Sequence, residues 1–333
     1  MCGIVGYIGR RNAVDVIVEG LHKLEYRGYD SAGVAVLNSN DTLECVRAVG
    51  KLENLDRELE HITCTGTVGV GHTRWATHGV PSLQNCHPHL DGPGTIAVVH
   101  NGIVENFKAL RTSLEAEGVV FRSDTDTETL AHLIRKYYQG DLRGAVSRAL
   151  KDVHGTYALG VVCEEHPGVI VAARQGSPLI LGIGEDEAFI ASDVPAIMKY
   201  TRQVCYVEDG CVCEVRAGDC GIWDLAGNAR DVQMTTVEWH VDAAEKDGYP
   251  HFMLKEIYQQ PEVLRNTLRG RVQDGEVKLE GVRVGAEVFT DCDRIVILAC
   301  GTAWHAGLVA KYWIEEFSGI PVEVDAASEF RYR

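Results

Sequence analysis

The stretch Met1-Cys2-Gly3-Ile4-Val5-Gly6-Tyr7-Ile8 opens the chain and predicts a buried β-strand that begins next to a thiol. Cys2 is small enough for Met1 to be removed, which would leave a free α-amine on the same Cα as the thiol. Such an amine titrates at about 7.7–8.0 and an ordinary thiol at about 8.5, so the amine can take the thiol's proton directly or through one water. The stretch therefore indicates either an N-terminal cysteine nucleophile or an ordinary first strand with a buried cysteine.

Composition is that of a globular protein with room for two domains. The 333 residues are 45% hydrophobic and 24% charged, and 48 acidic residues against 32 basic ones give a net charge of -16. This balance argues against a nucleic-acid partner, which needs a basic surface. The absence of a long apolar run or a secretory leader, with an odd number of cysteines, predicts a cytoplasmic protein without a membrane contact.

Two groups of residues have side chains that metals prefer. The cysteines are Cys205, Cys211, Cys213 and Cys220, and the histidines are His72, His78, His87 and His89. The cysteine spacing matches no paired CxxC pattern, and the alternation at Cys211–Val215 predicts a strand. The histidines lack an HExxH helix or a cysteine partner. We therefore expect no metal and no other cofactor.

Polar residues follow two predicted strands. Val68–Gly71 leads into the predicted loop His72-Thr73-Arg74-Trp75-Ala76-Thr77-His78-Gly79, in which the planar fork of Arg74 suits a carboxylate. Thr95–Val99 ends at His100-Asn101-Gly102. The Asn101 amide and the Gly102 N–H could stabilise a developing oxyanion, although Asn-Gly also marks a plain turn.

Helical spacing predicts helices at 11–24, 51–61, 104–117, 129–138 and 142–153. The helix at 51–61 is expected to be exposed, and alternating residues predict short strands from 157 to 237.

Between the first helix and the next strand, Arg27, Tyr29 and Asp30 either fix a turn through an ion pair or support Cys2. Thr125 and Glu128 have the spacing of a capping box. One carboxylate of this acidic cluster suffices as counter-charge for a substrate ammonium.

The last third of the chain predicts a second architecture. A polar linker at 241–248 precedes a helix at 249–269, in which Pro261 starts a new turn or a kink. The apolar strand at 294–299 then leads through Cys300-Gly301-Thr302-Ala303 into a helix at 304–317. A strand, a glycine turn and a helix N-terminus form an anion site that suits a sugar phosphate, and Thr302 could simply cap the helix.

Five stretches in order, Met1–Gly6, Leu24–Gly33, His72–Gly79, His100–Asn106 and Thr125–Glu128, resemble the glutaminase domain of glutamine amidotransferases of the N-terminal-nucleophile class. The resemblance is strongest to the branch that aminates fructose 6-phosphate. It implies an α+β fold, a four-layer αββα sandwich, followed by an incomplete α/β sugar-isomerase lobe. The implied domains are a glutaminase domain at 2–240, a linker and interdomain helix at 241–285, and the start of the sugar-isomerase domain at 286–333.

The resemblance also implies roles for individual residues. Cys2 resembles the nucleophile that forms a glutamyl thioester, and Asn101 with Gly102 resembles the oxyanion hole. Arg74 is similar to the residue that binds the glutamine α-carboxylate, and Asp126 to the one that binds the α-ammonium. The glutamine loop of the family corresponds to Trp75, Thr77 and His78. A partial sugar-phosphate site corresponds to Cys300, Gly301 and Thr302, although the family usually has Ser where Ala303 stands.

These roles imply an enzyme that hydrolyses glutamine and delivers ammonia to fructose 6-phosphate, producing glucosamine 6-phosphate and glutamate, as a homodimer in its full-length form. The further sugar-site residues of the family have no counterpart in this sequence, so we expect this chain alone to act only as a glutaminase. Two alternatives stay open. One is an enzyme like glutamine phosphoribosyl-pyrophosphate amidotransferase, and the other is an inactive binding or regulatory module.

Overall fold

The structure is a computed structural model that describes residues 2–62, 64–238, 248–268, 271–273, 276–277, 288, 291–330 and 332. The chain divides into two compact units, Met1–Lys255 and Glu256–Arg333. Most of the expected linker, up to residue 247, lies outside the described residues. Among the helices that the structure describes, none has the length and apolar character needed to cross a bilayer.

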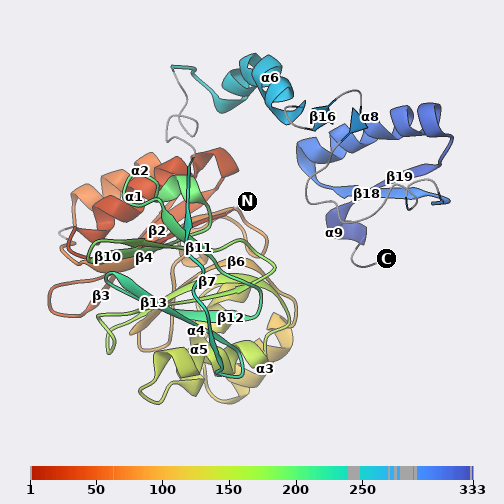
Figure 1. The fold of residues 1–333 in the computed structure, drawn as a ribbon. Coiled ribbons are helices and arrows are strands. Elements are labelled where there is room, and N and C mark those ends of the chain that lie inside the picture. Colours follow the sequence, from red (N-terminus) through yellow and green to blue (C-terminus); the bar gives the residue numbers. More distant parts are fainter. Residues whose placement is uncertain are drawn as a thin grey trace. The chain divides into compact units, whose positions relative to one another are not determined.

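Two antiparallel sheets form the centre of the first unit (Figure 1). In its described residues, the first sheet has eight strands, in the order β15 (Thr235–Thr236), β11 (Gln203–Tyr206), β9 (Ile180–Gly184), β10 (Glu187–Ala191), β1 (Gly3–Ile8), β4 (Val68–Arg74), β2 (Ser31–Leu37) and β3 (Leu43–Val49). The second sheet has seven, in the order β14 (Ala229–Arg230), β13 (Asp219–Asp224), β12 (Cys211–Arg216), β8 (Ile170–Gln175), β7 (Gly155–Cys163), β6 (Ile96–Val104) and β5 (His89–Leu90).

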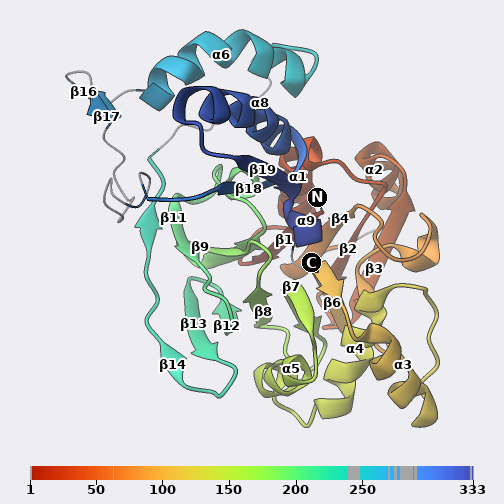
Figure 2. The same ribbon diagram turned by 90° about the vertical axis from the view of Figure 1, so that its right-hand side faces the viewer.

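Helices cover the outer faces of both sheets, as Figure 1 and Figure 2 show. The first sheet is covered by α1 (Ala13–Lys23) and α2 (Leu52–Glu60). The second is covered by α4 (Asp126–Tyr137) and α5 (Leu142–Lys151), and α3 (Phe107–Ala116) packs beside α4. Short 3₁₀ turns occupy Glu25–Arg27, Leu83–Asn85 and Val194–Ala196.

Three hydrophobic layers join these elements. One lies between α1, α2 and the first sheet, one between the two sheets, and one between the second sheet and its helices. In β1, Val5 and Tyr7 belong to the helix-facing layer, whereas Ile4 and Ile8 belong to the layer between the sheets. Because both faces of the strand are covered, its whole length is buried. The predicted four-layer αββα sandwich is confirmed.

The packing of α1 shows how local sequence builds this arrangement. The Asn12 side chain accepts a hydrogen bond from the Val14 N–H at 2.9 Å and so caps the helix. Ile17 and Leu21 then face the first sheet. A Cβ on Gly71 of β4 would lie 2.3 Å from Ile17 Cγ2, so glycine allows the helix to rest directly on the strand.

Several predicted boundaries were wrong. β4 continues through His72, Thr73 and Arg74, which were expected in a loop, because these residues pair with β1 and β2. β6 continues through Asn101 and Gly102 to Val104, so the interpretation of Asn-Gly as a plain turn is wrong. The helix expected from 104 begins only at Phe107, and α4 begins three residues earlier than expected, at Asp126.

The helix at 51–61 is present but not fully exposed. Leu52 and Leu55 of α2 are completely buried against the first sheet. The four cysteines weighed as metal ligands lie in strands: Cys205 in β11, Cys211 and Cys213 in β12, and Cys220 in β13. The strand prediction for that region is therefore confirmed.

The second unit contains a helix and the start of a parallel α/β arrangement. Its described elements are α6 (Phe252–Leu268), which begins just before the unit boundary, β16 (Val272–Gln273), β17 (Glu276–Val277), β18 (Ile295–Ala299), α8 (Gly301–Ser318), β19 (Val322–Ala326) and α9 (Ala327–Phe330). Pro261 lies inside the single helix α6. β18 and β19 pair in parallel, and Gly307 of α8 lies against Ile297 and Val324.

Candidate active site

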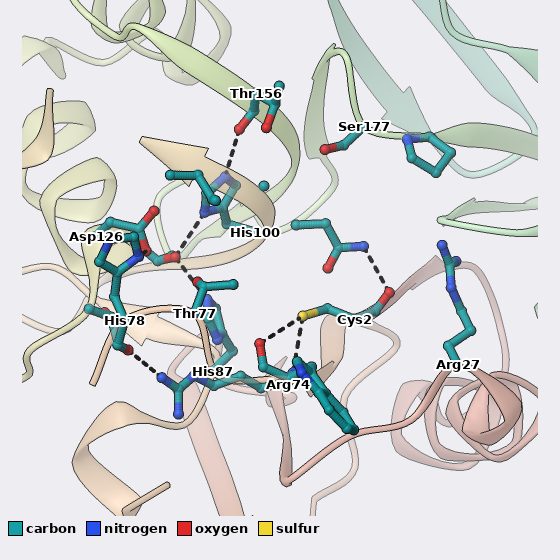
Figure 3. Close-up of a pocket in the computed structure, with 17 residues that line it drawn as sticks. Cys2, Arg27, Arg74, Thr77, His78, His87, His100, Asp126, Thr156 and Ser177 are labelled. Carbon is teal, nitrogen blue, oxygen red and sulfur yellow. Dashed lines mark hydrogen bonds and ion pairs between the residues drawn. The ribbon is translucent and has the colours of Figure 1, made fainter. Parts of the chain in front are cut away.

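A cavity of about 450 Å³ lies in the first unit and contains the expected glutaminase residues. Its walls come from Cys2 just before β1, the end of β4 and the loop after it, β6 and the start of α4 (Figure 3). The expected residues in its lining are Cys2, Arg74, Trp75, Thr77, His78, Asn101, Gly102 and Asp126. The others are Arg27, His87, His100, Ile103, Thr125, Thr127, Thr156, Ser177 and Pro178.

Cys2 lies immediately before β1, and its sulfur is held against the start of the loop after β4 (Figure 3). Its Sγ accepts a hydrogen bond from the Trp75 N–H at 3.1 Å and lies 3.5 Å from the Trp75 carbonyl oxygen. Burial raises the pKa of the Cys2 thiol, because a buried thiolate loses its hydration. The thiol therefore needs a nearby base before it can attack, and the Trp75 N–H can stabilise the thiolate once it has formed.

The Asn101 side chain contacts both Cys2 and the buried His72. Its Nδ2 donates to the Cys2 carbonyl oxygen at 3.2 Å, and its Oδ1 lies 2.9 Å from His72 Nε2. A primary amide has two N–H groups, so one remains for a ligand oxygen in the cavity.

Gly102 presents backbone to the same cavity. Its φ of 138° is accessible to glycine, and a Cβ would lie 2.0 Å from the Thr156 carbonyl oxygen. Just beyond the β6–β7 ladder, the Glu105 N–H donates to the His154 carbonyl oxygen, whereas the Val104 N–H donates to the Asp126 carboxylate at 2.8 Å. Along one strand of an antiparallel pair, N–H groups point alternately toward the partner strand and away from it. The N–H of Gly102, two residues before Val104, therefore also points away from β7.

Arg74 ends β4 and is 3% exposed. Its Nη2 donates to the carbonyl oxygens of His78 and Gly79, which folds the loop back over the strand end. Among the described residues, its Nη1 has no hydrogen-bond partner, and the Asp30 carboxylate lies 3.8 Å from it. A buried guanidinium donor without an acceptor, in the wall of a cavity, suits a ligand carboxylate.

Asp126 is the first residue of α4 and supplies the opposite charge. Its Oδ2 accepts the Val104 N–H, and its Oδ1 lies 3.9 Å from His78 Nδ1. Asp126 lines the cavity, and a carboxylate there suits a ligand ammonium (Figure 3). Trp75 and Thr77 form the exposed part of this loop, and the Trp75 ring lies over Gly28.

The turn before α4 is held by Glu128. Thr125 Oγ1 accepts the Glu128 N–H, so half of the predicted capping box is present. The Glu128 carboxylate instead accepts the N–H groups of Arg122 and Ser123 at 2.7 Å. Burial alone would raise the pKa of Glu128, but hydrogen bonds from His132, Ser123 and Arg122 lower it to about 2.

The segment with Arg27, Tyr29 and Asp30 contacts the surroundings of Cys2, whereas its alternative role, fixing a turn through an ion pair, stays a prediction. Arg27 donates to Ser192 Oγ at 2.8 Å, and Ser192 Oγ in turn accepts the N–H of Ile4, two residues after Cys2. Asp30 accepts the N–H of Ala76 in the loop after β4. The segment therefore fixes both the start of β1 and the loop beside the thiol.

The sequence did not single out a buried histidine layer next to the cavity. Its members, His72, His87, His89 and His100, are at most 5% exposed. Two features could have indicated it. His72 continues the alternation of Val68, Val70 and Arg74 toward the second sheet, and His100 adjoins Asn101 on β6. The described residues contain no group of three or more His, Cys, Asp or Glu side chains arranged to hold a metal ion.

The expected sugar-phosphate residues lie in the second unit, at the junction of β18 and α8. Cys300 is the N-cap residue of α8 without a side-chain capping bond, and Gly301, with a φ of 58°, is its first residue. Thr302 is the second residue of the helix, so the alternative that it caps the helix is wrong.

Comparison with known proteins identifies the class. The family model described as a glutamine amidotransferase domain matches residues 34–217, and one described as a SIS domain matches residues 288–333. The chain therefore belongs to the glutamine amidotransferase family.

A curated relative carries a more specific name than the family. The chain is 51% identical over 334 residues to a protein from Clostridium tetani named glutamine--fructose-6-phosphate aminotransferase (isomerizing), covering 100% of this chain and 55% of that protein. The chain thus spans about half the length of the curated relatives it matches.

Solved structures agree on the fold of the first unit. A structure described as the allosteric regulatory enzyme of purine biosynthesis has 27% identity and a TM-score of 0.60, over 68% of this chain and 50% of that one. Glutamine phosphoribosylpyrophosphate amidotransferase from B. subtilis has a TM-score of 0.61 at 22% identity, over 97% of this chain and 65% of that one, and supports the fold alone.

Proposed function

We propose that this chain, once Met1 is removed, hydrolyses glutamine through a thioester on Cys2. The observation that carries the proposal is the arrangement around one sulfur. The Asn101 amide lies beside Cys2, and the same cavity contains the carboxylate of Asp126 and the Nη1 of buried Arg74, which has no hydrogen-bond partner among the described residues. A free amino acid has two charged groups, and these two side chains carry the opposite charges.

The proposed reaction starts with proton transfer from the Cys2 thiol to its own α-amine. The thiolate attacks the side-chain carbonyl carbon of glutamine, and the N–H groups of Asn101 and Gly102 donate to the oxyanion. Each such donor lowers the barrier by about 2.7–4 kcal/mol. The C–N bond then breaks, ammonia leaves with the proton, and water hydrolyses the thioester to glutamate.

We further propose that the longer protein transfers this ammonia to fructose 6-phosphate and forms glucosamine 6-phosphate. The support is the name of the 51% identical relative and the SIS match at residues 288–333. In this proposal, Cys300, Gly301 and Thr302 contribute part of the sugar-phosphate site. The full-length protein is proposed to be a homodimer located in the cytoplasm.

The proposed domains are a glutaminase domain at 2–240, a linker and interdomain helix at 241–285, and the start of the sugar-isomerase domain at 286–333.

The test is an assay of glutamate and glucosamine 6-phosphate with the 333-residue chain, after mass spectrometry has shown that Met1 is absent. We expect glutamate release without sugar product. Cys2→Ala should abolish glutamate release, whereas Cys220→Ala, which removes a half-buried thiol outside the cavity, should leave the rate within about twofold. Glutamate release that survives in Cys2→Ala would refute the proposed nucleophile.

A further inference from the structure

His72 lies under the cavity, in the layer between the two sheets. It is completely buried on β4, where it pairs with Ile4 of β1 and with Gly33 of β2. Its ring also packs against the ring of His87 in a tilted arrangement, with ring centroids 4.1 Å apart. The ring therefore has little freedom to move, and its Nε2 lies 2.9 Å from Asn101 Oδ1.

The contacts of Asn101 determine which way its amide is turned. The Cys2 carbonyl oxygen, 3.2 Å away, can only accept a hydrogen bond, so the amide atom facing it has to be the Nδ2 group. Oδ1 then faces His72 and needs a donor there. His72 has to carry its proton on Nε2.

The surroundings of His72 agree with that tautomer. Burial lowers the pKa of His72 to about 3, so the ring is neutral at physiological pH and carries one N–H. Its Nδ1 has no hydrogen-bond partner among the described residues. A proton on Nδ1 in place of Nε2 would leave Asn101 Oδ1 facing the lone pair of Nε2.

We propose that His72 is a positioning residue that holds the Asn101 amide with its N–H groups turned toward Cys2. A flipped amide would direct an oxygen at the developing oxyanion and replace a stabilising donor with a repulsive acceptor. His72 does not touch the substrate, so its effect is on the transition state rather than on glutamine binding. This inference rests on the proposed glutaminase function of the site.

The experiment measures kcat and KM for glutamine in the Met1-free chain. His72→Leu removes the donor at similar volume and should lower kcat about 10- to 100-fold, with KM changed less than about threefold. His72→Gln carries an amide N–H near the Nε2 position and should restore kcat to within about fivefold of wild type. His72→Asn carries its amide near the Nδ1 position instead and should not restore it.

Asn101→Ala, which removes the positioned group itself, should lower kcat about 10²–10³-fold, and adding His72→Leu to it should cause no further loss. His132→Leu is the burial control, because His132 is 4% exposed and contacts Glu128 instead of Asn101. Additive losses in the double variant, or an equal kcat loss in His132→Leu, would overturn the positioning role, as would a wild-type kcat in His72→Leu. A wild-type chain that releases no glutamate would instead refute the proposed function.

Discussion

At the residue scale, two buried charges of opposite sign line one cavity without neutralising each other. Arg74 is fixed by the carbonyl oxygens of its own loop, and Asp126 by the Val104 N–H. Each side chain thus keeps one polar atom for a ligand. Such an arrangement is costly for the folded protein unless a ligand completes it, which is typical of a binding site.

Asp126→Asn tests the charge without removing the shape. The amide oxygen of Asn can still accept the Val104 N–H, so we expect little change in melting temperature. The loss of the ionic contact should raise KM for glutamine about 10- to 100-fold, because a hydrogen bond to a charged group contributes about 1.5–3 kcal/mol. Steady-state kinetics measure this effect.

The control is Asp124→Asn, two positions earlier on the same turn. Asp124 is exposed and lies outside the cavity. We expect its KM to stay within about twofold of wild type. An equal rise of KM in both variants, or an unchanged KM in Asp126→Asn, would argue against an ammonium contact at Asp126.

Some of these residues could be predicted from sequence and some could not. Cys2, Arg74 and Asn101 stand out because their chemistry is unusual beside apolar strands, whereas Asp126 was assigned by the family resemblance. All four line one cavity. The support for Asn101 could not be predicted, because His72 is 29 residues away and meets it only through the pairing of β4 in one sheet and the position of β6 in the other.

At the element scale, the cavity depends on strands that continue past their apolar segments. β6 carries His100 toward α4 and Asn101 toward the first sheet, and Gly102 follows with a backbone conformation that other residues rarely adopt. The sequence predicted a strand that ended before these residues, because polar side chains usually mark loops. They remain in the strand because β7 pairs with β6 along its full length.

Gly102→Ala should destabilise the first unit and abolish glutamate release. The new Cβ would lie 2.0 Å from the Thr156 carbonyl oxygen, which is backbone, so β6 would have to move. We expect a loss of about 2 kcal/mol or more in the free energy of unfolding, measured by urea denaturation. Gly118→Ala is matched in having a φ of 91° but meets no atom within 4 Å, so it should cost about 1 kcal/mol and keep activity. Equal effects of the two substitutions would contradict the close approach at Gly102.

At the scale of the whole molecule, a polar layer lies inside an otherwise apolar sandwich. His87 and His100 both hydrogen-bond Thr127 Oγ1 at 2.9 Å, which connects the start of α4 to β6. Burial lowers the pKa of His89 to about 3, and that of His87 and His100 also lies below its usual value. The αββα layering was predicted from the family resemblance that the motifs carry. The positions of His72 and His100 on predicted strands hint at this layer, but its contacts could not be predicted, because they depend on which residues meet between elements.

The buried histidines predict a pH dependence of stability. Below the ordinary value of 6.5 the unfolded chain binds protons at these residues, whereas folded His72 and His89 stay neutral until about pH 3. The free energy of unfolding should therefore fall as pH decreases from 6.5 toward 3. His89→Gln should reduce this slope by up to about 1.4 kcal/mol per pH unit, measured by urea denaturation at several pH values.

The matched control for this slope is His61→Gln, which replaces an exposed histidine at the end of α2. Its slope should equal that of the wild type. A slope that is unchanged in His89→Gln, or reduced as much in His61→Gln, would show that the buried layer does not cause the acid sensitivity.

The central claim is that glutamine is cleaved on the sulfur of an N-terminal Cys2. The most direct measurement is mass spectrometry of the Met1-free chain, quenched with acid during turnover and digested. The account predicts a γ-glutamyl group on the N-terminal peptide, bound through Cys2 and absent both from Cys2→Ala and from chains that retain Met1. Glutamate release with Cys2 unmodified, and with the group on another residue, would contradict it.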